Sequence, residues 1–124
     1  MDANRQEPKL TGEKFPAVGE VYWADTWIFG GSDPKPRRPC MVVRAPMSEA
    51  DVVMVITRTT EPGVRGVTHP PDRTMGLDEP GVFAGRRLHS AEARLFRPPQ
   101  VEYVGMLPEP YLSQVHNLYE EGGG

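Results

Sequence analysis

Two nearly continuous apolar runs in the middle of the chain constrain its fold more than any other feature. The first covers residues 39–45, the second covers residues 51–57, and a short polar connection separates them. Strands that are buried on both faces have such uninterrupted apolar sequences, and a short connection favours antiparallel pairing. We therefore expect the two runs to pair as a hairpin at the centre of a sheet.

The composition favours a single small β-rich domain. The chain has 124 residues, which suits one hydrophobic core, and its 14 prolines and 13 glycines indicate many turns and few long helices. Its single cysteine, Cys40, lies in the first apolar run, so we expect a buried thiol and a reducing, cytoplasmic environment. No stretch approaches the roughly 18 apolar residues that span a bilayer, and the polar start lacks a signal-peptide core, so we expect a soluble protein that is not secreted.

Weaker patterns place the other strands and loops. Residues 1–16 are polar, which predicts a flexible arm before a domain of residues 17–121. β-Branched and aromatic residues predict a strand at 18–24, and glycines and prolines then predict a long loop at 25–38. Further strands, all short, are expected at 67–69, at 81–84, near Leu88 and at 101–104.

The end of the chain has the pattern of a helix. Within residues 108–119 one helical face carries Leu112, Val115, Leu118 and Tyr119, and Glu109 and Pro110 suit the first turn. The residues from Glu120 onward are expected to fray, with 122–124 as a flexible tail. The expected fold class is therefore mainly β, an α+β arrangement with one C-terminal helix.

Charge is distributed unevenly along the chain. The formal net charge is −3, yet residues 35–97 hold eleven basic and seven acidic residues, while the segments on both sides are acidic. The total charge argues against a general nucleic-acid binder, whereas a basic middle permits a local anion-binding surface. Arginines that are simply scattered and solvated are the alternative.

One arginine and one hydroxyl lie at the ends of the two apolar runs. Arg38 precedes the first run and Thr57 closes the second. If the runs pair as a hairpin, the start of one lies beside the end of the other, and the two side chains can converge on one phosphate. Arg38 as an ordinary surface arginine and Thr57 as an ordinary β-forming residue remain the alternatives.

Four segments together resemble the MazF/PemK family of bacterial toxin endoribonucleases, over Gly19 to Tyr119. The opening strand G-x-[VI]-[YW]-[WFL] is matched by residues 19–23, and the strand [GHR]-R-P-[VAC]-[LV]-V-[IVL] by residues 37–43. Val55-Ile56-Thr57 matches a strand that ends in threonine or serine, and Gly105-Met106-Leu107 matches the segment before the C-terminal helix.

The resemblance implies a fold, an activity and partners. The fold would be a small SH3-like barrel of the CcdB/MazF type that forms a homodimer. The activity would be metal-independent cleavage of single-stranded RNA by the toxin component of a toxin-antitoxin system, with a cognate antitoxin protein as partner and no cofactor. Arg38 would stabilise the charge of the phosphorane, and Thr57 would orient the phosphate or the 2′-hydroxyl.

Several further residues are candidates for binding RNA: Arg37, Arg58, Arg86, Arg87, His89 and Ser90. For the arginines, solvated charge is an equal alternative. Family members often carry Gln-x-Arg-[TS] where this chain has residues 87–90, so the preferred RNA sequence stays open. Trp27 and Phe29 would either stack on unpaired bases or be buried. The three histidines have no metal-like spacing with Cys40 or with carboxylates, so no metal site is expected.

Two other classes of function are alternatives to the nuclease. The altered segment 87–90 and the acidic overall charge favour a non-catalytic module of the same fold that binds a host protein, either sequestering it or poisoning it as a relative does with DNA gyrase. An SH3-like adaptor for proline-rich peptides lacks the aromatic cluster that such grooves use.

Overall fold

Strands β2 (Arg37–Arg44) and β3 (Val52–Thr59) pair antiparallel at the centre of a sheet, as the two apolar runs predict. The computed structural model describes residues 15–31 and 33–122. Cys40 faces Thr57 and Val42 faces Val55 across the pair, and all four side chains are buried. The predicted hairpin and the predicted buried thiol are confirmed, and burial raises the pKa of Cys40 to about 12.

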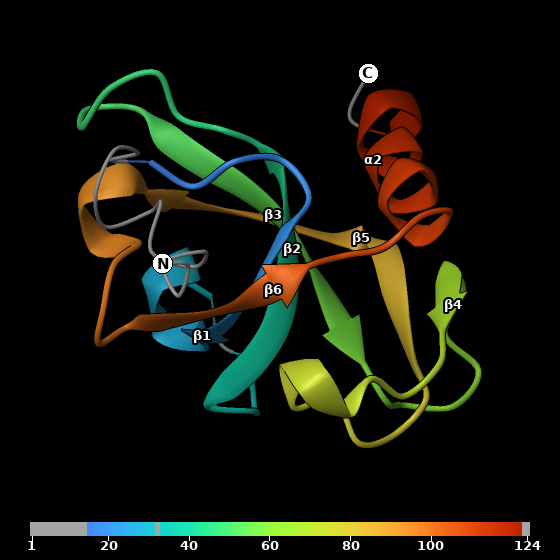
Figure 1. The fold of residues 1–124 in the computed structure, drawn as a ribbon. Helices are drawn as coiled ribbons and strands as arrows, with labels where there is room; N and C mark the ends of the chain where they lie inside the picture. The colour runs from blue at the N-terminus through green and yellow to red at the C-terminus, as the bar shows by residue number, and fades with distance from the viewer. Residues whose placement is uncertain (1–14, 32, 123–124) are drawn as a thin grey trace, which may run out of the picture.

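The other strands extend this pair on both sides (Figure 1). Strands β1 (Glu20–Asp25) and β6 (Val101–Met106) follow β2, while β5 (Gly81–Glu92) and β4 (Val67–His69) follow β3. The sheet order is β4-β5-β3-β2-β1-β6, and every neighbouring pair is antiparallel. Three short 3-10 helices lie in the connections: η2 (Thr26–Phe29), η3 (Arg73–Met75) and η4 (Ala93–Leu95).

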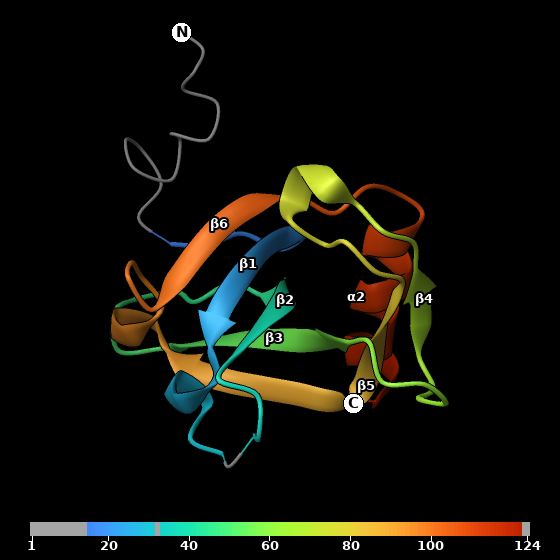
Figure 2. The same ribbon diagram turned by 90° about the horizontal axis from the view of Figure 1, so that it is seen from below.

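The sheet curls from β6 round to β5 (Figure 2). Its two faces bury separate apolar clusters. One cluster includes Tyr22, Val55 and Phe96. The other includes Ile56 and Phe83 and is covered by helix α2 (Tyr111–Gly122), which packs on β5, β2 and β4. The alternation of side chains along β2 and β3 divides their apolar residues between the two clusters. The result is the mainly β fold with a C-terminal helix that the sequence predicts.

Two of the expected short strands are parts of one long strand. Residues 81–84 and Leu88 both belong to β5, which pairs with β3 along most of its length. The register shifts on β3 between Ile56 and Arg58, where the pairing with β5 is irregular. Gly85-Arg86-Arg87 interrupts the apolar pattern, so the sequence predicts two short strands where the structure has one continuous strand.

The helix begins and ends slightly later than the pattern predicts. It starts at Tyr111, and the carboxylate of Glu109 accepts hydrogen bonds from the Ser113 backbone N–H (3.1 Å) and hydroxyl (2.8 Å). It continues to Gly122, past the expected fraying at Glu120. Within the described residues no helix is long and apolar enough to cross a membrane. Most of the expected N-terminal arm, residues 1–14, lies outside the described residues.

Candidate functional site

Arg38 and Thr57 lie on the same face of the sheet, at the start of β2 and the end of β3. Thr57 faces Cys40 across the pair, and Arg38 precedes Cys40 by two residues, so its side chain points to the same face. Diagonal neighbours of this kind have Cα atoms about 7–8 Å apart. The hairpin therefore brings together the two residues that the sequence singles out.

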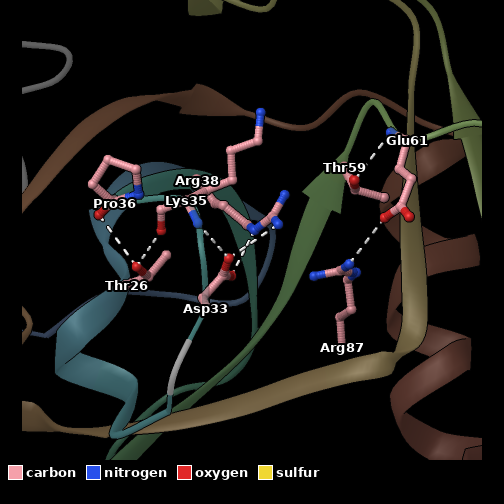
Figure 3. Close-up of polar contacts among 8 residues, drawn as sticks. All are labelled: Thr26, Asp33, Lys35, Pro36, Arg38, Thr59, Glu61 and Arg87. Carbon is pink, nitrogen blue, oxygen red and sulfur yellow. Dashed lines mark hydrogen bonds and ion pairs between the residues drawn. The ribbon is translucent and has the colours of Figure 1, made fainter.

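Arg38 is held by the carboxylate of Asp33, from the loop between β1 and β2. Its side chain is 8% exposed, and it donates from Nε to Asp33 Oδ2 (2.6 Å) and from Nη2 to Asp33 Oδ1 (3.0 Å) (Figure 3). The hydrogen bond from Arg38 and a second one from the Lys35 backbone N–H lower the pKa of Asp33. The two-pronged pairing fixes the direction of the guanidinium, and the sequence offers no strong signal for Asp33.

The Thr57 hydroxyl makes no hydrogen bond within the described part of the chain. The residue is fully buried, and its Oγ1 has no hydrogen-bond partner among the described residues. A buried hydroxyl left in this state costs roughly 1–3 kcal/mol. A valine would fill the same position without that cost, so packing alone does not account for threonine here.

A second ion pair joins strand β5 to the loop that follows β3. Arg87 of β5 donates from Nη2 to Glu61 Oε1 over 3.4 Å, and the Glu61 backbone N–H donates to Thr59 Oγ1 over 3.1 Å (Figure 3). His89 faces Val55 on β3, so its side chain lies on the same face as that of Thr57. Arg87, His89 and Asp33 are close enough for their charges to influence one another.

Arg37 and Arg58 project to the opposite side of their strands. Arg37 pairs with Asp25 (Nη1 to Oδ1, 2.6 Å). Arg58 is 3% exposed and donates to His69 Nδ1 (3.1 Å) and to the Glu79 carbonyl (2.7 Å), among other acceptors. With Arg38 they line a hollow of about 300 Å³ at the ends of β2 and β3. Arg58 holds the segment around β4, a role that the sequence does not reveal.

Arg86 and Ser90, the remaining RNA-binding candidates, both belong to β5. Both are exposed, and Ser90 faces Met54 on the side of the sheet opposite to His89. Arg86 lines a separate hollow of about 490 Å³ with Arg65, Arg87 and the loop that follows Glu61. Within residues 15–31 and 33–122, no three His, Cys, Asp or Glu side chains are placed to hold a metal ion.

The geometry defines a class of fold: a curled, six-stranded antiparallel sheet with one C-terminal helix, which is a MazF-like mainly β fold. A solved structure similar to this chain is the crystal structure of MazE-MazF (Form-II) from Deinococcus radiodurans. A chain of that structure matches with a TM-score of 0.55 and 15% identity, over 88% of this chain and 95% of that chain. No family model matches the sequence, and no curated protein matches it. At this identity the likeness shows the fold alone, and it confirms the predicted fold.

Proposed function

We propose that the chain is a metal-independent endoribonuclease that cleaves single-stranded RNA as the toxin of a toxin-antitoxin system. It would act as a homodimer and bind a cognate antitoxin protein. One observation carries the proposal: a fork-shaped cation and an unused buried hydroxyl, Arg38 and Thr57, share one face at matched strand ends. The similarity in fold to a chain of a MazE-MazF complex supports it.

The arrangement suits cleavage by the RNA's own 2′-hydroxyl. In that reaction the 2′-oxygen bonds to phosphorus as its proton passes to water, and the P–O5′ bond breaks as the leaving 5′-oxygen takes up a proton from water. The protein must orient the 2′-hydroxyl and stabilise the charge on the phosphorane. The Arg38 guanidinium would hold two phosphate oxygens, as it now holds the two carboxylate oxygens of Asp33. The Thr57 hydroxyl would accept or donate a hydrogen bond that orients the reacting group.

Binding of RNA would require Asp33 to give up its position. Arg38 is 7% exposed as a residue and is held by Asp33, and Thr57 is fully buried, so RNA binding would have to displace the Asp33 carboxylate from Arg38 and uncover the Thr57 hydroxyl. A phosphate offers the same two-oxygen geometry as the carboxylate, and the exchange therefore replaces one charged pair by another.

The test is cleavage of single-stranded RNA in the presence of a chelator. Wild-type protein is expected to cut, and Arg38→Ala and Thr57→Ala are expected to abolish cutting while the fold is retained. Arg44→Ala is a matched control, because Arg44 lies at the other end of β2 and also pairs with an aspartate, Asp51 (3.3 Å). Equal residual cleavage by wild type and by a double Arg38 and Thr57 variant would refute the proposal.

The second candidate is a non-catalytic module that binds a host protein. It is favoured by the burial of Arg38 and Thr57 and by the Arg38–Asp33 pair, which together leave the proposed active groups covered. Under this alternative, purified protein shows no nuclease activity, and a partner captured from host lysate is retained by Arg38→Ala.

A further inference from the structure

A cavity of about 230 Å³ adjoins the Arg38 and Thr57 site and is unused by the proposed cleavage reaction. It lies between the loop that joins β1 to β2, which contributes Phe29 and Asp33, and strand β5, which contributes Arg87 and His89. Its volume is below the roughly 300–1,000 Å³ of pockets for drug-sized ligands, which suits a single ring system. Asp33 lines this cavity and also holds Arg38, so the cavity and the proposed phosphate position share one residue.

One wall of the cavity is a stacked pair of rings. The Phe29 and His89 rings are 5.3 Å apart between centroids, with 23° between their planes, and both side chains are half-buried. Burial lowers the pKa of His89; the Asp33 charge opposes this shift, and the charges of Arg87 and Arg38 assist it. Flat aromatic rings of this kind serve as platforms on which nucleobases stack.

Two charged side chains line the cavity, the carboxylate of Asp33 and the guanidinium of Arg87; the Thr26 hydroxyl also lines it but already donates to the Lys35 carbonyl. Asp33 offers acceptor oxygens, and Arg87 offers donors that are only weakly engaged by Glu61 at 3.4 Å. Guanine is the base that presents two neighbouring donors, N1–H and the 2-amino group, beside an acceptor, O6. A carboxylate matches the two donors, and an arginine matches the acceptor.

We propose that this cavity binds one guanine base of the RNA, stacked on Phe29, whose ring is itself stacked on His89, and selected by Asp33 with Arg87. The inference rests on the proposed action on RNA. When a phosphate takes the Arg38 fork, the carboxylate of Asp33 is released beside the cavity and turns to the base. Phosphate binding and base recognition are thereby coupled through one side chain, and Asp33 determines specificity.

Binding of uncleavable 2′-deoxy tetranucleotides tests this directly. One inner position is guanine, adenine, cytosine or thymine, and the others are thymine. Wild-type protein is expected to bind the guanine oligonucleotide at least roughly 10-fold more tightly than the other three. Asp33→Asn should reduce that one affinity to the level of the others without weakening them, because an amide cannot accept from both donors.

Two further variants separate recognition from folding. Phe29→Leu should weaken the guanine oligonucleotide by roughly 10-fold, because the stacking surface is lost. Tyr119→Leu is the control, since Tyr119 is also a partly buried aromatic residue but belongs to α2 and does not line the cavity; this variant should bind like wild type. Equal affinity for the four oligonucleotides, or a guanine preference that survives Asp33→Asn, would overturn the proposal.

The outcome is distinguishable from failure of the proposed function. Guanine-selective binding that depends on Asp33, in a protein that does not cleave RNA, would support the cavity and reject the nuclease. Cleavage of RNA by a protein without an Asp33-dependent preference would support the nuclease and reject the cavity.

Discussion

Arg38 and Arg58 lie on neighbouring central strands, and both are buried, at 7% and 3% exposure, yet their partners differ in kind. Arg38 is held by one loop carboxylate, Asp33. Arg58 is held by the His69 ring nitrogen and by the backbone carbonyls of His69, Pro70 and Glu79. A phosphate can take the place of a carboxylate, whereas carbonyls fixed in the chain cannot be exchanged. The kind of partner, more than the degree of burial, therefore distinguishes an arginine that can bind a ligand from one that only stabilises the fold. We call the second kind a structural brace.

Thr57 and Thr59, two residues apart on β3, show the same contrast. Thr59 Oγ1 accepts a hydrogen bond from the Glu61 backbone N–H at 3.1 Å and so stabilises the start of the loop after β3. Thr57 Oγ1 has no partner in the described part of the chain. One hydroxyl is used by the fold, and the other is left available for a ligand.

The largest effect is expected for Arg38→Lys. Lysine keeps the positive charge but cannot hold two phosphate oxygens in a planar fork, so RNA cleavage should fall by roughly 100-fold or more. The free energy of unfolding should change little, because the ammonium of the introduced lysine still faces Asp33. Single-turnover cleavage and urea denaturation measure the two quantities, and unchanged cleavage would remove the distinction between the two arginines.

Arg58→Lys should have the reverse effect. The ammonium cannot reach His69 and the carbonyls together, so buried acceptors lose their donors and the free energy of unfolding should fall by about 2 kcal/mol. Cleavage per folded molecule should stay within about twofold of wild type, since the expected loss is in stability and not in the barrier to reaction. A variant as stable as wild type would show that Arg58 is not a brace.

His69 makes the Arg58 brace sensitive to pH. Burial first, and the Arg58 charge second, lower the pKa of His69 from its ordinary 6.5, while Asp72 opposes the shift. Below about pH 6.5 the unfolded state therefore binds more protons than the folded state, and stability falls as pH falls. His89 is shifted in the same direction, mainly by burial. Urea denaturation between about pH 5.5 and pH 7.5 should show the loss, and His69→Gln should reduce it; an unchanged pH profile in that variant would contradict the assignment.

The smallest effects compare the two threonines. Thr57→Val removes a buried hydroxyl that lacks a partner among the described residues, so the free energy of unfolding should stay unchanged or rise by up to about 1 kcal/mol. Thr59→Val breaks the hydrogen bond from Glu61 and should lose about 1 kcal/mol. If both variants lose the same stability, Thr57 has a structural partner, and the contrast is wrong.

The sequence predicts the centre of the fold well because the signal there is strong. Two long apolar runs with a short connection specify the hairpin, and the hairpin brings Arg38 beside Thr57. The interrupted pattern at Gly85-Arg86-Arg87 conceals the continuity of β5, because a curled strand that passes between two environments has no single periodicity. The confirmed fold follows from the parts of the chain where burial is continuous.

The partners of the polar side chains could not be predicted in the same way. Asp33 reaches Arg38 because of the path of a loop, and no local pattern encodes that path. Arg58 meets His69 eleven residues later, after the chain has turned back along the sheet edge. Phe29 stacks on His89 from a distant part of the sequence. These contacts depend on packing, which a single sequence does not specify.

RNA cleavage by Thr57→Val in the presence of a chelator, measured beside its thermal stability, separates the role of this hydroxyl in the reaction from its role in the fold. The unused hydroxyl is proposed to serve the reaction and not the fold. We predict that the variant melts at or above the temperature of the wild type and does not cleave single-stranded RNA that the wild type cuts. Cleavage at the wild-type rate by an equally stable Thr57→Val protein would contradict the account.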